Sequence, residues 1–130
     1  QAAQELPLPN VRVHPVRAEE AGRGHLRNAA ALVTARAVAS LPELLEYVAP
    51  FACRDGLIAL PKGSRLKDEL AGAQFALSEL ACEFVAVVPM RPEISEFGRV
   101  LLLRKIARTP LEYPRKPGIA GKTPLANPIT

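Results

Sequence analysis

The chain has 130 residues, enough for one domain, and 48% of them are hydrophobic, so it can form a core. It has no run of eighteen apolar residues, which argues against a transmembrane helix, and its first residues lack the regions of a signal peptide. Because Gln1 stands where an initiator Met would be, we expect a chain that begins mid-gene, or that was processed or cut.

The cysteines and histidines do not predict a metal site. Cys53 and Cys82 have no metal-ligand spacing, and His14 and His25 lie far from both in the sequence. Each cysteine has apolar neighbours, and nothing in the sequence suggests export. We therefore expect two reduced thiols in a cytoplasmic protein, with no metal and no membrane partner.

The positive charge is concentrated at one end of the chain. The segment from Arg104 onward has six basic residues and one acid, a net charge of +6 − 1 = +5, against 11 − 12 = −1 for the rest. The basic residues are Arg104, Lys105, Arg108, Arg115, Lys116 and Lys122. Such a segment suits a polyanion such as RNA, although a solubilising tail would explain the charge equally well.

The first half of the chain alternates between strand and helix patterns. Residues 10–14 alternate at period two, which predicts a strand, and residues 18–21 begin a short helix that Gly22 or Gly24 ends. The apolar run at residues 30–35 predicts a buried parallel strand. Ser40 and Glu43 then fit a capping box at the start of a helix.

The second half continues the alternation. Residues 57–60 predict a strand, and a helix follows from Ser64, with Leu66, Leu70, Ala73, Leu77 and Leu80 on its buried side. Residues 83–88 and 99–106 predict two more strands with no helix between them, which permits an antiparallel pair. From Thr109 onward the prolines predict an irregular tail. We expect an α/β fold in residues 1–107 and a basic, proline-rich tail in residues 108–130.

Charged residues follow three of the predicted strands, at the edge where open α/β sheets bind ligands. Glu19 follows the first strand, Arg36 the second and Lys62 the third. A carboxylate there could accept hydrogen bonds from a ligand, and Arg36 could bind a carboxylate or phosphate. Each has a structural alternative: charge at a helix N-terminus, a surface ion pair and a solvated loop lysine, respectively. No phosphate-binding glycine loop and no catalytic pair of side chains is present.

Several motifs, taken together, resemble the GidB (RsmG) family of bacterial small-subunit rRNA methyltransferases. Residues 33–39, VTARAVA, resemble the family's strand V-[ST]-[AS]-R-A-[VF]-A, and residues 56–63, GLIALPKG, its next strand. RAEE at 17–20 and the tail TPLEYPRKPG at 109–118, after Arg104-Lys105, match in the same order, and Lys122-Thr123-Pro124-Leu125 continues the tail. The likeness covers nearly the whole chain.

The resemblance implies the C-terminal part of a class I methyltransferase with a Rossmann-like sheet. Strands 3 to 7 of the order 3-2-1-4-5-7-6 would be present with their helices, the last two as an antiparallel pair. The activity implied is methyl transfer from S-adenosylmethionine to N7 of a guanine in 16S rRNA, with the small ribosomal subunit as partner. The family's first two strands have no counterpart, so we expect these 130 residues alone to be inactive and to bind the cofactor poorly or not at all.

The resemblance also implies roles for individual residues, none of them an identifiable catalytic group. Ala18, Glu19 and Arg36 would bind the cofactor, and Arg36 could instead reach the target base. Contacts with RNA phosphates would come from Lys62, Arg104, Lys105, Arg115, Lys116 and Lys122. Two alternatives stay open: an RNA-binding remnant without catalysis, and a fragment stabilised by another chain.

Overall fold

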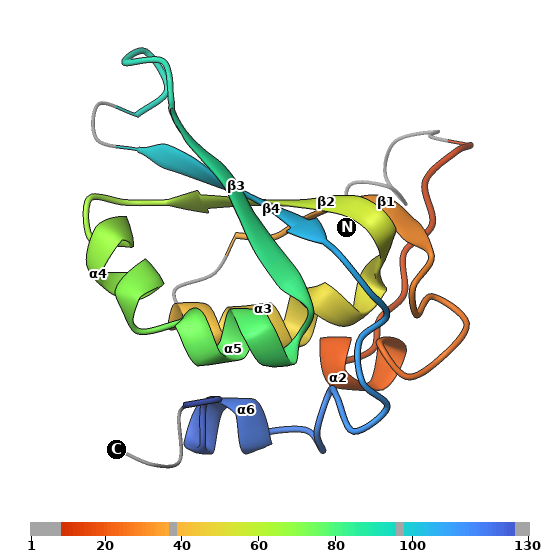
Figure 1. Cartoon of the computed structure of the whole chain (residues 1–130). Coiled ribbons are helices and arrows are strands. Elements are labelled where there is room, and N and C mark those ends of the chain that lie inside the picture. Colours follow the sequence, from red (N-terminus) through yellow and green to blue (C-terminus); the bar gives the residue numbers. More distant parts are fainter. Residues whose placement is uncertain (1–8, 37–38, 96–97, 127–130) are drawn as a thin grey trace.

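The computed structural model describes residues 9–36, 39–95 and 98–126 and has the expected α/β architecture (Figure 1). Its strands are β1 (Ala30–Thr34), β2 (Ala52–Lys62), β3 (Cys82–Pro89) and β4 (Arg99–Lys105). The helices are α2 (Ala18–Ala21), α3 (Leu41–Val48), the 3-10 turn η1 (Ala49–Phe51), α4 (Leu66–Ala71), α5 (Gln74–Glu79) and α6 (Ile119–Lys122). No helix among these residues is long and apolar enough to cross a membrane.

The four strands form one sheet in the order β1-β2-β4-β3. β1 and β2 are parallel, whereas β4 runs antiparallel to both of its neighbours, β2 and β3. This arrangement is the expected 4-5-7-6 part of the class I order, and it confirms the antiparallel final pair. Since β3 therefore runs in the same direction as β1 and β2, the carboxyl ends of these three strands share one edge of the sheet.

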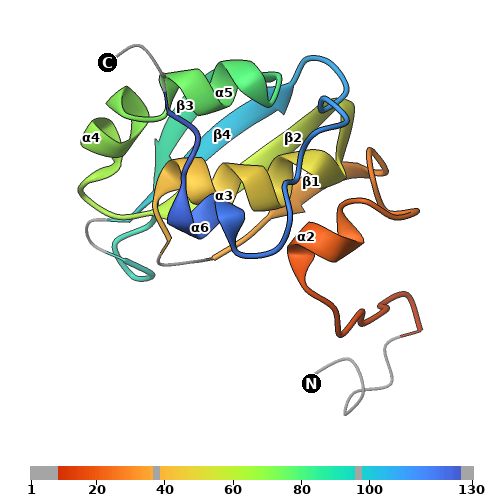
Figure 2. The ribbon, with the colours of Figure 1, turned by 90° about the horizontal axis from the view of Figure 1, so that it is seen from below.

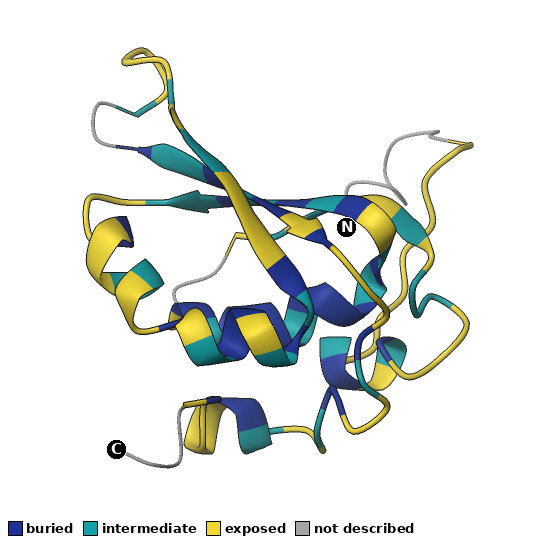
Figure 3. Cartoon of the chain, in the orientation of Figure 1, coloured by how far each residue is buried: buried dark blue, intermediate teal, exposed yellow. Residues whose placement is uncertain are grey.

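The core lies between one face of the sheet and the helices α3 and α5 (Figures 1 and 2). Alternate residues of the strands point to this face, so that Ile58 and Leu60 of β2 and Leu101 and Leu103 of β4 are fully buried. α3 contributes a stripe at helical spacing that includes Leu41, Leu44, Leu45 and Val48. Figure 3 shows these buried segments facing each other.

The strand predicted at residues 10–14 does not form. Residues 11–15 have no regular secondary structure, and Val11 and Val13 are 44% and 39% exposed. In the class I order, two further strands would separate this segment from β1. Without a neighbour to pair with, an alternating sequence has no ladder partners and no surface on which to bury its apolar side chains.

Two local predictions were also wrong. The helix predicted from Ser64 is divided into α4 and α5 at Gly72 and Ala73, although the predicted buried stripe holds for Leu66, Ala73, Leu77 and Leu80. Ser40 is the N-cap of α3 but makes no side-chain cap hydrogen bond. The Glu43 side chain instead accepts a hydrogen bond from the Tyr47 hydroxyl at 2.7 Å, one helical turn later.

The C-terminal segment packs against the domain rather than extending from it as a separate tail. α6 lies beside α3 (Figure 2), and Tyr113, Ala120 and Leu125 are buried. The described residues of this segment, up to residue 126, therefore pack on the same core as the sheet and α3.

Candidate functional site

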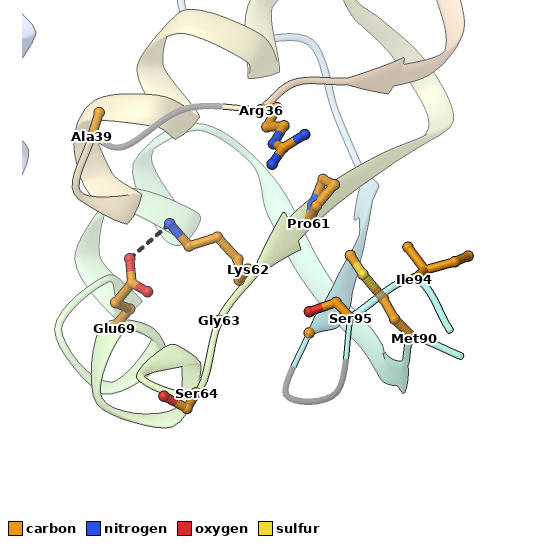
Figure 4. Close-up of a pocket in the computed structure, with 11 residues that line it drawn as sticks. Arg36, Ala39, Pro61, Lys62, Gly63, Ser64, Glu69, Met90, Ile94 and Ser95 are labelled. Atoms are coloured by element: carbon orange, nitrogen blue, oxygen red, sulfur yellow. Dashed lines mark ion pairs between the residues drawn. The ribbon is translucent and has the colours of Figure 1, made fainter. Parts of the chain in front are cut away.

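A hollow of about 1160 Å³ lies at the carboxyl ends of β1 and β2 (Figure 4). One of its walls comes from the ends of these parallel strands and contains Arg36, Pro61, Lys62, Gly63 and Ser64. The opposite wall comes from the connection between β3 and β4. Open α/β sheets bind ligands at this edge, because the loops that leave adjacent strands diverge there.

Arg36 and Lys62, which the sequence placed at strand ends, meet in this hollow but differ in their partners. The Lys62 side chain is only 7% exposed, and its ammonium forms an ion pair with Glu69 at 2.8 Å (Figure 4). Arg36 is exposed and has no hydrogen-bond or ion-pair partner within residues 9–36, 39–95 and 98–126. The Arg36 guanidinium can therefore bind a carboxylate or phosphate without breaking an internal contact.

The second wall was not anticipated from the sequence. Met90, Ile94, Ser95 and Gly98 line it, and all belong to the hairpin that joins β3 to β4. The sequence carried only a weak signal, since apolar residues such as Ile94 are common in loops and do not by themselves identify a site.

Glu19 does not share the hollow with Arg36. α2 precedes the segment that leads to the amino ends of β1 and β2, where Asn28 and Ala29 donate main-chain hydrogen bonds to Pro50 and Phe51. The Glu19 side chain is buried and accepts hydrogen bonds from the Gly118 amide at 3.0 Å and from Arg17 at 3.2 Å. Burial acts to raise the pKa of Glu19, but the hydrogen bonds from main-chain amides, including that of Gly118, and the charge of Arg17 lower it overall.

Thus, in this structure, Ala18 and Glu19 are not assembled with Arg36 into one cofactor pocket. The Glu19 carboxylate serves the fold, because it fixes the start of α6 to α2. The sequence offered a structural alternative for Glu19, a charge at a helix N-terminus. The contact with the Gly118 amide, at the start of α6, agrees with that alternative in part.

Arg115 is likewise engaged inside the fold. Its guanidinium binds the Glu46 carboxylate through both Nε and Nη2, with the shortest contact at 2.7 Å, and its amide donates to the same carboxylate at 2.7 Å. Glu46 is 1% exposed and belongs to α3. The hydrogen bonds with Glu46 raise the pKa of Arg115, and burial opposes this only in part. This pair fixes the C-terminal segment to the principal helix of the core.

Arg27 binds the main chain of residues 109–113, just before Arg115. Its guanidinium donates to four main-chain carbonyls, at 2.6 Å to Tyr113, 2.9 Å to Thr109, 3.0 Å to Pro110 and 3.1 Å to Gly22. Arg23 adds a hydrogen bond to the Pro114 carbonyl. The turn at residues 109–114 is therefore stabilised by two arginines from the loop after α2, a role that the sequence did not reveal.

Lys105 is fully buried, which argues against the expected contact with an RNA phosphate. Its ammonium donates to the carbonyls of Ala49 at 2.9 Å and Ala52 at 3.1 Å. Burial lowers the pKa of this lysine. The alternation of β4 explains the placement: Lys105 shares the inward phase of Leu101 and Leu103, whereas Arg104 points outward and is exposed.

The remaining basic residues of this segment lie at the surface. Arg104, Arg108, Lys116 and Lys122 are exposed. Within the described part of the chain, no group of three or more His, Cys, Asp or Glu side chains could hold a metal ion. Both cysteines are free thiols, and burial raises the pKa of Cys82 to about 11.

Comparison with known proteins identifies the family. The family model described as "GidB: rRNA small subunit methyltransferase G" matches residues 1–95. Proteins named ribosomal RNA small subunit methyltransferase G from Roseiflexus castenholzii, Desulfitobacterium hafniense and Staphylococcus aureus are each 38% identical to this chain, over 121, 125 and 124 residues. These alignments cover 92%, 94% and 95% of this chain but only 52% of each relative, so the chain spans about half their length. The chain belongs to the GidB family of rRNA small subunit methyltransferase G.

Proposed function

We propose that this chain forms the C-terminal part of a cytoplasmic enzyme that transfers a methyl group from S-adenosylmethionine to N7 of a guanine in 16S rRNA. The observation that supports this most directly is the hollow at the carboxyl ends of β1 and β2, where Arg36, which has no ion-pair partner among the described residues, lies beside Lys62. That position matches the ligand-binding edge of an open α/β sheet, in a chain whose relatives are named as rRNA methyltransferases.

The residues of the hollow fit one end of the cofactor. S-adenosylmethionine carries a carboxylate, which the free guanidinium of Arg36 can bind in two-pronged fashion. Glu19 fits less well, since its buried carboxylate already accepts the Gly118 amide. Arg36 is therefore the proposed contact with the cofactor. Its alternative role is a contact with the target nucleotide.

The cofactor supplies an already activated methyl group on a sulfonium, so the protein's task is alignment rather than acid–base chemistry. Arg36 would orient a bound anion at the strand ends. The ion pair with Glu69 at 2.8 Å fixes the Lys62 ammonium at the same edge and balances its charge, so Arg36 is the group of the two that would attract an anion. Neither residue needs to exchange a proton for this role.

The exposed cations Arg104, Lys116 and Lys122 are the proposed contacts for the rRNA backbone. The resemblance also assigned Lys62, Lys105 and Arg115 to RNA, but they are left out of this set because each is bound within the fold. RNA affinity that depends on exposed cations falls steeply with salt, and each lost phosphate contact reduces that dependence.

The test is methyl transfer from labelled S-adenosylmethionine to small ribosomal subunits by the complete product of the gene. Arg36→Gln should lower transfer at least tenfold, whereas Arg54→Gln, an exposed arginine at the opposite end of β2, should leave it unchanged (about tenfold corresponds to ~1.4 kcal/mol). Cleavage of the labelled RNA at N7-methylguanosine tests the position. RNA binding without any transfer would refute the enzyme and support a non-catalytic RNA-binding role.

A further inference from the structure

The two walls of the hollow have different chemistry. The strand-end wall presents the exposed Arg36 and the ion pair of Lys62 with Glu69, whereas the hairpin wall presents Met90 and Ile94 (Figure 4). Ile94 is 74% exposed, among the most exposed large apolar side chains of the described residues. An exposed apolar side chain that also lines a charged hollow suggests contact with a ligand that is flat and apolar in one part and anionic in another.

The hairpin head has a defined shape. Ile94 and Ser95 both donate main-chain hydrogen bonds to the Arg91 carbonyl, at 2.9 and 3.0 Å, and the Met90 amide donates to Gly98 at 3.0 Å. Gly98 is required here, because a Cβ at this position would lie 2.7 Å from both the Met90 sulfur and the Ser95 hydroxyl. The turn therefore holds Met90 against the hairpin base and leaves Ile94 outside.

The same turn also presents a cation. Arg91 is exposed, and its carbonyl accepts the main-chain amide of Ile94, so the charge and the apolar side chain belong to one hydrogen-bonded turn. A nucleotide in a single strand offers the complementary pair: an apolar base face and an adjacent phosphate. A stable protein partner would bury about 800 Å² of surface on each side, from about 20–30 residues, many more than this turn contains.

We propose that the turn at residues 91–95 of the β3–β4 hairpin, with Ile94 as its apolar contact, holds an unstacked base of the RNA beside the hollow while Arg91 binds the neighbouring phosphate. This inference rests on the proposed function, since it assumes an RNA substrate. It assigns the contact with a base to the hairpin wall and leaves anion binding at the strand ends to Arg36. An unstacked base exposes its apolar face, and an apolar side chain against that face offsets part of the cost of unstacking.

The test compares two labelled oligomers of about twelve nucleotides, one an ordinary RNA and one with the same backbone but no bases, by fluorescence anisotropy with the complete gene product. Ile94→Ser should weaken binding of the ordinary RNA about fivefold and leave the abasic oligomer unaffected. Ile94→Leu should restore the affinity. The matched control is Leu111→Ser, since Leu111 is 86% exposed but lies in the segment after β4, away from the hollow.

The outcomes separate the two proposals. If Ile94→Ser behaves like Leu111→Ser while the wild-type protein methylates ribosomal subunits, the hairpin inference is overturned and the proposed function stands. Equal weakening of both oligomers would also overturn it, because a base contact cannot act on an abasic strand. If RNA binding depends on Ile94 but no methyl transfer occurs, the hairpin contact stands and the enzymatic function fails.

Discussion

The ion pair between Glu46 and Arg115 should respond unequally to loss of either member. Glu46 is 1% exposed, whereas the Arg115 side chain is 25% exposed. In the Arg115→Met variant, a buried carboxylate keeps only a main-chain amide as partner, so we expect a loss of about 3–5 kcal/mol in the free energy of unfolding. In Glu46→Gln, the guanidinium can turn toward water and still donate to the Thr123 carbonyl, so the expected loss is about 1–3 kcal/mol.

Urea unfolding followed by circular dichroism measures both losses, and the double variant completes a mutant cycle. Because the two side chains are in direct contact, the coupling energy should be about 1–3 kcal/mol. Lys116→Met is the control: this exposed neighbour should change stability by less than about 0.5 kcal/mol. A larger loss in Glu46→Gln than in Arg115→Met, or a coupling energy near zero, would refute the reasoning from burial.

Three further predictions follow from burial and charge. Burial and the hydrogen bond to Glu79 raise the pKa of Tyr113 from 10.0 to about 12. The contribution of the neutral phenol to stability is therefore complete below pH 10 and is lost as the pH rises toward 12. Tyr113→Phe should flatten this alkaline decline in the free energy of unfolding, measured with urea, and an unchanged decline would argue against the assignment. The 130 residues alone should show no micromolar affinity for S-adenosylmethionine in calorimetry, since they lack the first two strands of the class I sheet; measurable micromolar binding would contradict this. The helices among the described residues cover one face of the sheet (Figure 1), whereas Leu32 and Val88 lie on the other face and are 60% and 44% exposed. The chain should therefore bind the dye ANS, and the double variant Leu32→Lys, Val88→Lys should reduce the ANS fluorescence. Fluorescence equal to that of the parent chain would count against an apolar open face.

The central elements could be predicted because their signal is local. The apolar runs in β2 and β4 predict strands whatever surrounds them, and the leucines of α3 recur at helical spacing. The sheet order came from the resemblance, since the spacing of the strands alone allowed an antiparallel pair but did not specify its neighbours. The structure confirms both parts of that expectation.

Elements whose formation depends on distant partners were not predictable in the same way. Residues 10–14 have the alternation of a strand, but a strand needs a neighbour, and the described residues provide none. Similarly, Glu43 has the spacing of a capping box, yet Tyr47 provides a competing donor one turn away. Local pattern sets what a segment can form, and the available partners decide which possibility is realised.

The charge of the C-terminal segment shows the same limit and changes where RNA binding should be sought. Its +5 excess counts Lys105, whose ammonium is bound to carbonyls contributed by residues more than fifty positions away, and Arg115, whose charge is balanced by Glu46. Neither contact can be read from the segment itself, because burial and pairing depend on α3 and on the start of β2. With those two cations bound inside the fold, four exposed ones remain: Arg104, Arg108, Lys116 and Lys122. Segment charge therefore overstates the cations available to a phosphate backbone, and the proposed RNA recognition rests more strongly on Arg36, for which the described residues provide no partner, and on the hairpin wall of the same hollow.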